Sequence, residues 1–285
     1  MPVLGEEVYA DSFGAHAGGG AFITAAHLVA CGKDAALCAV LPAAPFGALI
    51  QDEIEASNVD LRPSVFASPE WGHQTTIAMA HNDDRAFLTK RGGDAVPQSC
   101  QSELESGRYT HLHIAELATL IECPEILGWA RGAGMTISLD CSWDVDAMRH
   151  PDAIELISKT DVFLPNLAEL QFVLQSQSLV TSDVSDAFGT NCMVAIKCGA
   201  DGASAVLHGQ QVHADALKTD VIDTTGAGDA FNAGFIAKWI DSQSIHDCLY
   251  AGNKRAAIAV STLGGASSVA TETDCEIVAA RSANS

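Results

Sequence analysis

Short apolar runs alternate with helical segments along this chain, and this alternation is the feature that most constrains its fold. Strands that are joined by helices run parallel, so the pattern predicts a mostly parallel sheet with helices on both faces, an α/β fold of three layers. Such sheets bind their ligands beyond the carboxyl ends of the strands. The runs occupy residues 110–115, 136–139, 162–164 and 192–197, and helical patterns follow the first three at 121–133, 151–158 and 168–174.

Residues 60–92 depart from this alternation because their apolar side chains recur at every second position. Ile77 and Met79 share one face of a predicted strand, and Leu88 lies on the predicted partner strand. The turn sequence at 81–84 separates the two strands. The pattern predicts a small antiparallel β flap on the α/β body, and an ordinary edge hairpin is the simpler alternative.

An earlier apolar run at 35–40 is followed by two prolines and then by a predicted amphipathic helix over 46–56. Leu49, Ile50 and Ile54 share one face of that helix. This segment therefore adds one more strand and helix to the alternating pattern.

Composition excludes several classes of protein. The 285-residue chain is 48% hydrophobic, which suffices for a large core. Its 36 acidic and 15 basic residues give a net charge of −21, which disfavours nucleic-acid and anionic-membrane partners. No apolar run reaches the roughly 18 residues of a membrane span, and the first residues lack a signal-peptide pattern. Nine cysteines without a Cys-x-x-Cys pair are typical of a reducing compartment, so we expect a cytoplasmic enzyme.

The strongest local signal is the segment Asp-Thr-Thr-Gly-Ala-Gly-Asp-Ala-Phe at 223–231. A glycine-rich turn that opens a helix presents backbone N–H groups at the positive end of the helix dipole, which suits a phosphate group. The segment is neither a Walker A loop nor a dinucleotide-binding fingerprint. Asp229 adjoins this anion site, which suits a base that takes the proton of an attacking hydroxyl group. A helix-start acid that only stabilises the dipole is the alternative.

Residues 223–231 resemble the signature of the ribokinase-like (PfkB) carbohydrate kinases, and this resemblance extends from about residue 2 to residue 268. It implies a ribokinase-like α/β/α body with a small β-strand lid. It also implies that Gly226, Ala227 and Gly228 form the anion hole for the transferred phosphoryl group. Asp229 is then the general base. In potassium-dependent members, the positions of Asp223 and Thr225 also help to hold a monovalent cation.

Further segments resemble the nucleotide-binding elements of the same family. Asn166 and Glu169 match an Asn-x-x-Glu element that serves Mg²⁺ and the nucleotide phosphates, and they also fit a helix capping box. Lys197, Gly199 and Gly202 lie in a turn that resembles Thr-x-Gly-x-x-Gly, with Lys in place of the usual Thr. Two interpretations of Lys197 stay open, a phosphate contact and a solvated strand end.

Two later segments complete the resemblance. Asn253 occupies the usual Asn position of the helix that flanks adenine in the family. Gly264 and Ser268 lie in a segment that resembles the loop completing the monovalent-cation site. An ordinary glycine-rich helix stop is the alternative for that loop.

The amino-terminal part matches the family less closely. Gly18 and Gly19 fall on the glycine pair that approaches the sugar, but Ile23 stands where the family usually has a hydroxyl-binding Asn. The family's first strand, whose end supplies a sugar-binding Asp, is expected to be absent from this chain. The resemblance places the nucleotide- and substrate-binding body at 15–59 and 93–285 and the lid at 1–14 and 60–92.

Three polar residues outside these motifs carry open alternatives. His111 and His113 share a face of the strand predicted at 110–115, which suits a metal pair, but no third ligand is apparent nearby. Asp140 directly follows the strand predicted at 136–139. It is either a residue behind the active site or a turn acid.

The resemblance implies ATP-dependent phosphorylation of a hydroxymethyl group of a small sugar, with Mg²⁺ and, in some members, K⁺. In many members the lid closes over the sugar and pairs with its counterpart in a homodimer. A nucleoside kinase of the same family is the nearer alternative, and a base-stacking Phe13 or Phe22 would favour it. A non-catalytic nucleotide-binding relative is the other alternative, and Ile23 together with the missing first strand motivates it.

Overall fold

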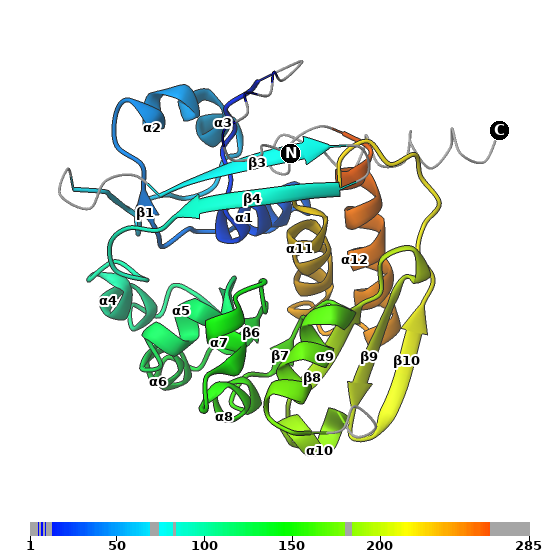
Figure 1. Cartoon of the computed structure of the whole chain (residues 1–285). Helices are drawn as coiled ribbons and strands as arrows, with labels where there is room; N and C mark the ends of the chain where they lie inside the picture. The colour runs from blue at the N-terminus through cyan, green and yellow to red at the C-terminus, as the bar shows by residue number, and fades with distance from the viewer. Residues whose placement is uncertain are drawn as a thin grey trace.

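The computed structural model describes residues 13–68, 74–81, 84–179 and 184–262, together with Gly5, Glu7 and Tyr9. A six-stranded sheet forms the centre of this part of the chain, in the order β10-β9-β8-β7-β6-β5 (Figure 1). The four neighbours β5 to β8 pair in parallel, and β9 and β10 complete the sheet in antiparallel fashion. The predicted mostly parallel α/β sheet is therefore confirmed. Its strands are β5 (His111–Ile114), β6 (Thr136–Leu139), β7 (Val162–Phe163), β8 (Met193–Lys197), β9 (Ala203–Leu207) and β10 (Gln210–Ala214).

Helices cover both faces of this sheet, as the strand–helix alternation predicts. One face packs against α4 (Cys100–Leu104), α5 (Leu117–Glu122), α6 (Ile126–Gly132), α7 (Val145–Arg149), α8 (Ala153–Ser158), α9 (Leu167–Ser176) and α10 (Val184–Phe188). The other face packs against α11 (Ala227–Trp239) and α12 (Ile245–Val260), which lie side by side, with α1 (Gly20–Ala30) beside α11 (Figure 1).

Each strand divides its side chains between the two faces. In β7, Val162 belongs to the cluster under α11 and α12, whereas Phe163 belongs to the cluster on the opposite face. In β8, Met193 and Ala195 likewise face α11 and α12. Because successive side chains of a strand point to opposite faces, Lys197 is directed to the same side as Met193 and Ala195. A charged side chain thus ends a strand whose other side chains on this face, Met193 and Ala195, are apolar.

Two predicted helices are shorter than the sequence pattern suggested. The helix expected over 121–133 is divided into α5 and α6 because Pro124 lies between them and cannot continue a helix. The helix expected over 46–56 is divided into α2 (Phe46–Leu49) and α3 (Gln51–Ala56), and Ile50 between them leaves helical geometry with ψ near 5°. Apolar periodicity alone does not detect such interruptions.

The apolar run at 35–40 does not enter the six-stranded sheet. Its end forms β1 (Val40–Leu41), which pairs in parallel with β2 (Val65–Phe66) in a separate two-stranded sheet. Within the described residues, β5 pairs only with β6. The division of the chain into a body and a lid stays a prediction, although β2 falls in the segment predicted as lid.

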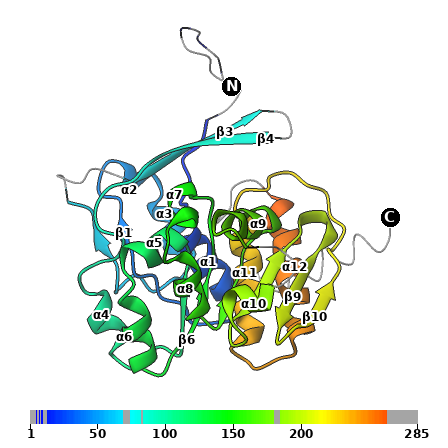
Figure 2. The same cartoon turned by 60° about the horizontal axis from the view of Figure 1, so that its bottom comes forward.

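The predicted flap is present as an antiparallel hairpin of β3 (Thr75–His81) and β4 (Asp84–Lys90), which projects from the body in Figure 2. Ile77 pairs with Leu88 and Met79 with Ala86, so the expected side chains share a face. Half of the predicted turn, at 82–83, lies outside the described residues. None of the described helices is long and apolar enough to cross a membrane.

Gly202 closes the turn between β8 and β9, and its conformation is one that other residues rarely adopt. Its φ is +85°, and its carbonyl oxygen accepts a hydrogen bond of 2.9 Å from the Cys198 N–H. A Cβ there would overlap the Ala214 carbonyl oxygen and lie 2.6 Å from the Ala216 nitrogen. Backbone atoms cannot move aside as the end of a side chain can.

We expect Gly202→Ala to destabilise the protein more than Gly209→Ala, the matched control. Gly209 has a φ of +73°, but a Cβ there would meet nothing within 4 Å. Both positions have a positive φ, which costs a residue with a Cβ about 1–3 kcal/mol. The overlap at Gly202 adds about 1–3 kcal/mol to the loss in the free energy of unfolding. Chemical denaturation measures both variants, and equal losses would show that the close approach at Gly202 has no energetic weight.

Candidate active site

The glycine-rich segment at 223–228 forms the loop that starts α11. Gly226 is the N-cap residue with a left-handed backbone, φ +74° and ψ 2°, which a residue without a Cβ adopts at little cost. Before it, the Asp223 carboxylate accepts a 2.8 Å hydrogen bond from the Thr225 N–H. The Ala227 N–H donates to the Thr224 carbonyl at 3.3 Å. The N–H groups of the first helical turn have no acceptor within the helix, so this loop can bind an anion.

Asp229 lies in the first turn of α11 and faces the start of α1. A Cβ added to Gly20 would come within 2.8 Å of Asp229 Oδ1 and 3.7 Å of the Ala115 Cβ. The Thr24 hydroxyl donates to the Asp229 carbonyl oxygen at 3.3 Å. The beginnings of α1 and α11 and the carboxyl end of β5 therefore meet at the Asp229 carboxyl group.

The predicted substrate glycines lie at this meeting point. Gly18 and Gly19 are exposed, and Gly19 is the N-cap residue of α1 with φ +89°. Gly20 follows directly and contacts the Asp229 carboxyl region. The structure thus brings the two predicted halves of the site, more than two hundred residues apart in the chain, next to each other.

The pKa of Asp229 is raised to about 7. Burial is the main cause, the Asp140 carboxylate adds to it, and the Lys197 ammonium group opposes it. Glu116 and Glu169 raise the pKa of Asp229 further. A carboxyl group with a pKa near neutral pH takes up and releases a proton readily, which suits general base catalysis.

Lys197 is not a solvated strand end, so that interpretation is wrong. Its Nζ donates to Asp140 Oδ1 at 2.8 Å and to Asn232 Oδ1 at 3.2 Å, and the Asn232 side chain donates to Asp140 Oδ2 at 2.6 Å. The Lys197 side chain is only 13% exposed and that of Asp140 8%. The three side chains form a closed, buried hydrogen-bonded ring beneath the start of α11.

Asn166 and Glu169 form the capping box that the sequence allowed. Asn166 Oδ1 accepts from the Glu169 N–H at 2.9 Å, and Glu169 Oε2 accepts from the Asn166 N–H at 2.8 Å. Glu169 is buried, which raises its pKa, and Asp140 raises it further. The capping role leaves the other carboxylate oxygen of Glu169 for a further ligand.

The other predicted nucleotide-binding residues surround the turn between β8 and β9. Gly199 lies in a single 3-10 turn, Gly199–Asp201, that Gly202 closes. The side chain of Asn253 in α12 is buried, and its amide nitrogen donates to the carbonyl oxygens of Ala214 and Asp215 at 2.9 and 3.1 Å. Asn253 thus fixes the segment after β10 against α12.

Glu116 is a candidate that the sequence analysis did not identify. It lies two residues after the end of β5 and is the N-cap residue of α5, where its side chain makes no capping hydrogen bond. Burial raises its pKa, and the nearby Arg91 lowers it. An acidic residue after the strand predicted at 110–115 was the available signal, since ligands bind at that end of a parallel sheet.

Most of the other residues considered from the sequence lie away from Asp229, whereas His113 is close enough to Asp140 and Lys197 for both to act on its pKa. Ile23 and Phe22 are buried in the apolar cluster around α1, and Phe13 is 94% exposed. His111 and His113 both contact the Ser138 hydroxyl, at 2.8 and 2.9 Å, and burial lowers both pKa values. The described residues contain no group of three metal ligands. Gly264 and Ser268 lie outside the described residues.

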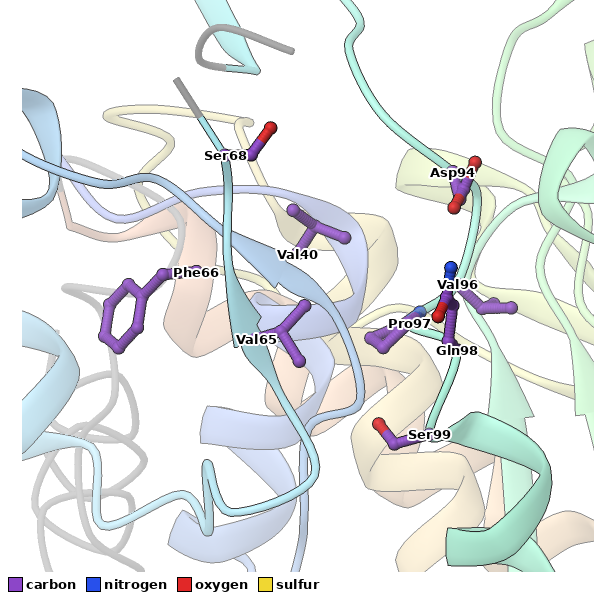
Figure 3. A pocket seen from close by; sticks show the side chains of 9 residues that line it. All are labelled: Val40, Val65, Phe66, Ser68, Asp94, Val96, Pro97, Gln98 and Ser99. Carbon is purple, nitrogen blue, oxygen red and sulfur yellow. The ribbon is translucent and has the colours of Figure 1, made fainter. Parts of the chain in front are cut away.

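A cavity of about 310 Å³ lies between the β1–β2 sheet and segment 94–99 (Figure 3). None of the predicted site residues lines it. The candidate site therefore follows from the convergence at Asp229 and not from this cavity, which is lined by Val40, Val65, Phe66, Ser68, Asp94, Val96, Pro97, Gln98 and Ser99.

The residues near Asp229 fit Mg²⁺ in the manner usual for nucleotide enzymes. Mg²⁺ there is held by one or two carboxylates, with phosphate oxygens and water as the other ligands, and not by a cage of protein ligands. The second carboxylate oxygen of Glu169 suits this role directly or through water. The Asp223 carboxylate and Thr225 belong to the loop that starts α11, but the rest of the predicted monovalent-cation site is not described.

The raised pKa of Asp229 makes a prediction for stability. Its folded pKa of about 7 exceeds the unfolded value of roughly 3.9, so ionisation opposes folding as the pH rises between these values. Asp229→Asn should therefore raise the melting temperature at pH 8 and have little effect at pH 4. Thermal melts of Glu125→Gln, an exposed control, should show no such trend. A stability difference that does not change with pH would contradict the raised pKa.

The sequence of this chain is similar to those of known sugar and nucleoside kinases. The model of the pfkB family carbohydrate kinases matches residues 2–272. The ATP-dependent ribose-1-phosphate kinase of Halopiger xanaduensis is 29% identical over 256 residues, which covers 88% of this chain and 82% of that protein. The nucleoside kinase of Methanothermobacter thermautotrophicus is 22% identical over 206 residues, which covers 71% of this chain and 64% of that protein.

The fold has solved counterparts as well. Arabidopsis thaliana ribokinase complexed with ribose and ATP gives a TM-score of 0.80 at 19% identity, covering 98% of this chain and 92% of that one. At this identity the likeness shows the ribokinase fold. The family match spans nearly the whole sequence, and the chain belongs to the pfkB family of carbohydrate kinases.

Proposed function

We propose that this protein transfers the γ-phosphoryl group of ATP to a hydroxymethyl group of a small sugar or sugar phosphate. As a member of the pfkB family it is a phosphotransferase with an alcohol group as acceptor. The observation that carries the proposal is the position of Asp229. Its carboxyl group, with a pKa of about 7, lies between the anion-binding loop and the exposed Gly18–Gly19 pair.

The proposed reaction is an in-line displacement at the γ-phosphorus. Asp229 accepts the proton of the acceptor hydroxyl group, and the oxygen of that group attacks the phosphorus. The bond from the phosphorus to the β,γ-bridging oxygen breaks at the same time, and ADP leaves with the electron pair. The N–H groups of Gly226, Ala227 and Gly228 lie where they can stabilise negative charge on the transferred group, at the positive end of the α11 dipole. Ala227 would have to exchange its 3.3 Å bond to Thr224 for the phosphoryl oxygen.

The nucleotide side of the site is proposed to lie across the turn of Gly199 and Gly202 and the start of α9. The Asn166 and Glu169 pair lies near the phosphates, and Asn253 supports the segment that borders the adenine. Mg²⁺ bound near Glu169 supplies positive charge that offsets the phosphate oxygens. That charge matters because the whole protein carries −21 and repels the nucleotide.

Asp223 and Thr225, with Gly264 and Ser268, are proposed to hold a monovalent cation such as K⁺. Their oxygen atoms are hard ligands, and a cation there would stabilise the loop that ends at Gly226. Activity that rises with K⁺ at constant ionic strength would support this role.

A sugar fits the acceptor side better than a nucleoside does. Phe22 is buried in the core and Phe13 is almost fully exposed, so neither has the position of a ring that stacks on a base. Glu116, by contrast, places an additional carboxyl group near Asp229, and a carboxylate binds sugar hydroxyl groups well. The similarity to a ribose-1-phosphate kinase adds a sugar phosphate to the acceptors to be tested.

The β3–β4 hairpin is proposed to act as the lid and as the contact of a homodimer. Ile77 and Leu88 pair on one face and are 49% and 63% exposed, and Phe87 on the other face is 53% exposed. Exposed apolar groups on both faces suit two contacts, one over the substrate and one with a second chain. Closure over the acceptor would exclude water, which competes as a phosphoryl acceptor.

We expect the wild-type protein to form ADP with one acceptor from a panel of ribose, ribose 1-phosphate, fructose and adenosine in the presence of Mg²⁺ and K⁺. Asp229→Asn should lower kcat by about 10²-fold or more because it removes the general base. ATP binding, measured by calorimetry, should persist in the variant. ATP binding by the wild type without turnover on any acceptor would favour a non-catalytic role.

Gly20→Ala should lower kcat by about tenfold or more, while the melting temperature changes little. The new Cβ would displace the Asp229 carboxyl group, and a small misplacement of a catalytic group costs much activity. The matched control is Gly132→Ala in α6, where a Cβ would meet nothing within 4 Å. Full activity of Gly20→Ala would show that Asp229 does not need its present position.

A further inference from the structure

The ring of Asp140, Lys197 and Asn232 joins parts of the chain that are far apart. Asp140 follows β6, Lys197 ends β8, and Asn232 lies in α11, three residues after Asp229. All three pairs within the ring are hydrogen-bonded, at 2.6 to 3.2 Å. The Cys141 N–H donates to Asp140 Oδ1 at 2.8 Å and fixes that carboxylate as well.

The ring has no evident value for stability alone. Asn232 is fully buried, and Asp140 and Lys197 nearly so. Removing two opposite charges from water costs about as much as their attraction returns, so apolar side chains of similar size would serve the fold as well or better. A charged pair in this position therefore points to a role in the neighbouring site.

The Lys197 ammonium group lies against the loop that starts α11. A Cβ at Gly228 would lie 3.4 Å from Lys197 Nζ, so the cation adjoins the proposed anion hole. A cation near the amino-terminal end of a helix is unfavourable unless negative charge compensates it. Asp140 supplies that charge by direct contact, and Glu169 and Asp229 contribute at longer range. Burial opposes the charge of Lys197, but these carboxyl groups keep its pKa above the ordinary value.

Lys197 Nζ uses two of its three N–H groups within the ring. Among the described residues it donates to Asp140 and Asn232, and both lie in the interior. These two contacts favour a supporting role for Lys197 over a phosphate contact. A nucleotide ligand would extend from the turn at Gly199.

We propose that Asp140, Lys197 and Asn232 form a positioning unit for Asp229, in which the Lys197–Asp140 pair sets the charge beside the anion-binding loop and Asn232 fixes the pair to the helix that carries Asp229. The proposal rests on the proposed function, in which Asp229 is the base. Lys197 is a positioning residue here and does not touch the substrate.

The unit acts on Asp229 through opposed charges. Lys197 lowers the pKa of Asp229, whereas Asp140, Glu116 and Glu169 raise it. Removal of the lysine charge should therefore make Asp229 hold its proton to higher pH. Removal of the Asp140 charge should have the opposite effect. If the ring only stabilised the fold, the two substitutions would not shift the pKa of Asp229 in opposite directions.

The test compares Lys197→Met with Asp140→Asn by the pH dependence of kcat. We expect the acidic limb of the profile to move up by about one pH unit or more in Lys197→Met and to move down in Asp140→Asn. Arg131→Met is the matched control because it breaks a 2.7 Å ion pair with Asp161 that lies at the opposite ends of the strands. Its profile should coincide with that of the wild type.

A second measurement separates positioning from nucleotide binding. In Lys197→Met we expect kcat to fall by about tenfold or more while the ATP dissociation constant from calorimetry changes by less than about threefold. A large loss of ATP affinity with an unchanged profile would make Lys197 a phosphate ligand and overturn the proposal. Acidic limbs that stay in place, or that move in the same direction in both variants, would also overturn it.

The titration of Asp229 itself keeps the proposal testable without turnover. Carbon NMR of the labelled Asp229 carboxyl group should show the same opposed shifts in Lys197→Met and Asp140→Asn. If the wild type turned over no acceptor but these shifts appeared, the proposed function would fail and the positioning unit would stand. Circular dichroism of each variant identifies any that do not fold. If Lys197→Met does not fold, Lys197→Arg replaces it. Because Lys197→Arg keeps the charge, we expect the acidic limb of its kcat profile to stay at the wild-type pH.

Discussion

One buried ammonium group organises the charges of this site. Lys197 lies beneath the first turn of α11, in contact with Asp140, and its field reaches the carboxyl groups of Glu169 and Asp229. Burial and the neighbouring carboxyl groups outweigh this cation, so the pKa of Asp229 is raised to about 7. The arrangement requires the ends of β6 and β8 and the start of α11 to meet at one edge of the sheet. A parallel sheet covered by helices provides that meeting.

At this edge of the sheet, the backbone N–H groups attract negative charge, whereas the carboxyl groups repel it. The loop around Gly226 lies at the positive end of α11, which suits the proposed phosphoryl group, although the protein as a whole carries a charge of −21. Local dipoles therefore have to act at short range, where screening by water and salt is weak. Gly20 allows the start of α1 to approach Asp229, so the carboxyl group lies where α1 and α11 begin, between the proposed acceptor and phosphoryl sides.

Much of the fold could be predicted from local signals. The strand at 136–139 matches β6 in both bounds, and the alternation of Ile77 and Met79 predicted that these side chains share one face of the hairpin. The capping box of Asn166 and Glu169 and the helix after the loop at 223–228 were also predicted. Each of these features depends on neighbours within a few residues, so that spacing and residue type were enough to find it.

The partners of Lys197 could not be predicted in this way. Its place in a turn left a phosphate contact and a solvated end open, and the choice depended on which face of β8 the side chain occupies. Asn232 and Glu116 gave no motif, and Asp140 is separated from Lys197 by 57 positions in the chain. Packing brings these groups together and removes water from between them. Burial and proximity, and not residue type, then set the proton affinity of Asp229, because both depend on three-dimensional distance.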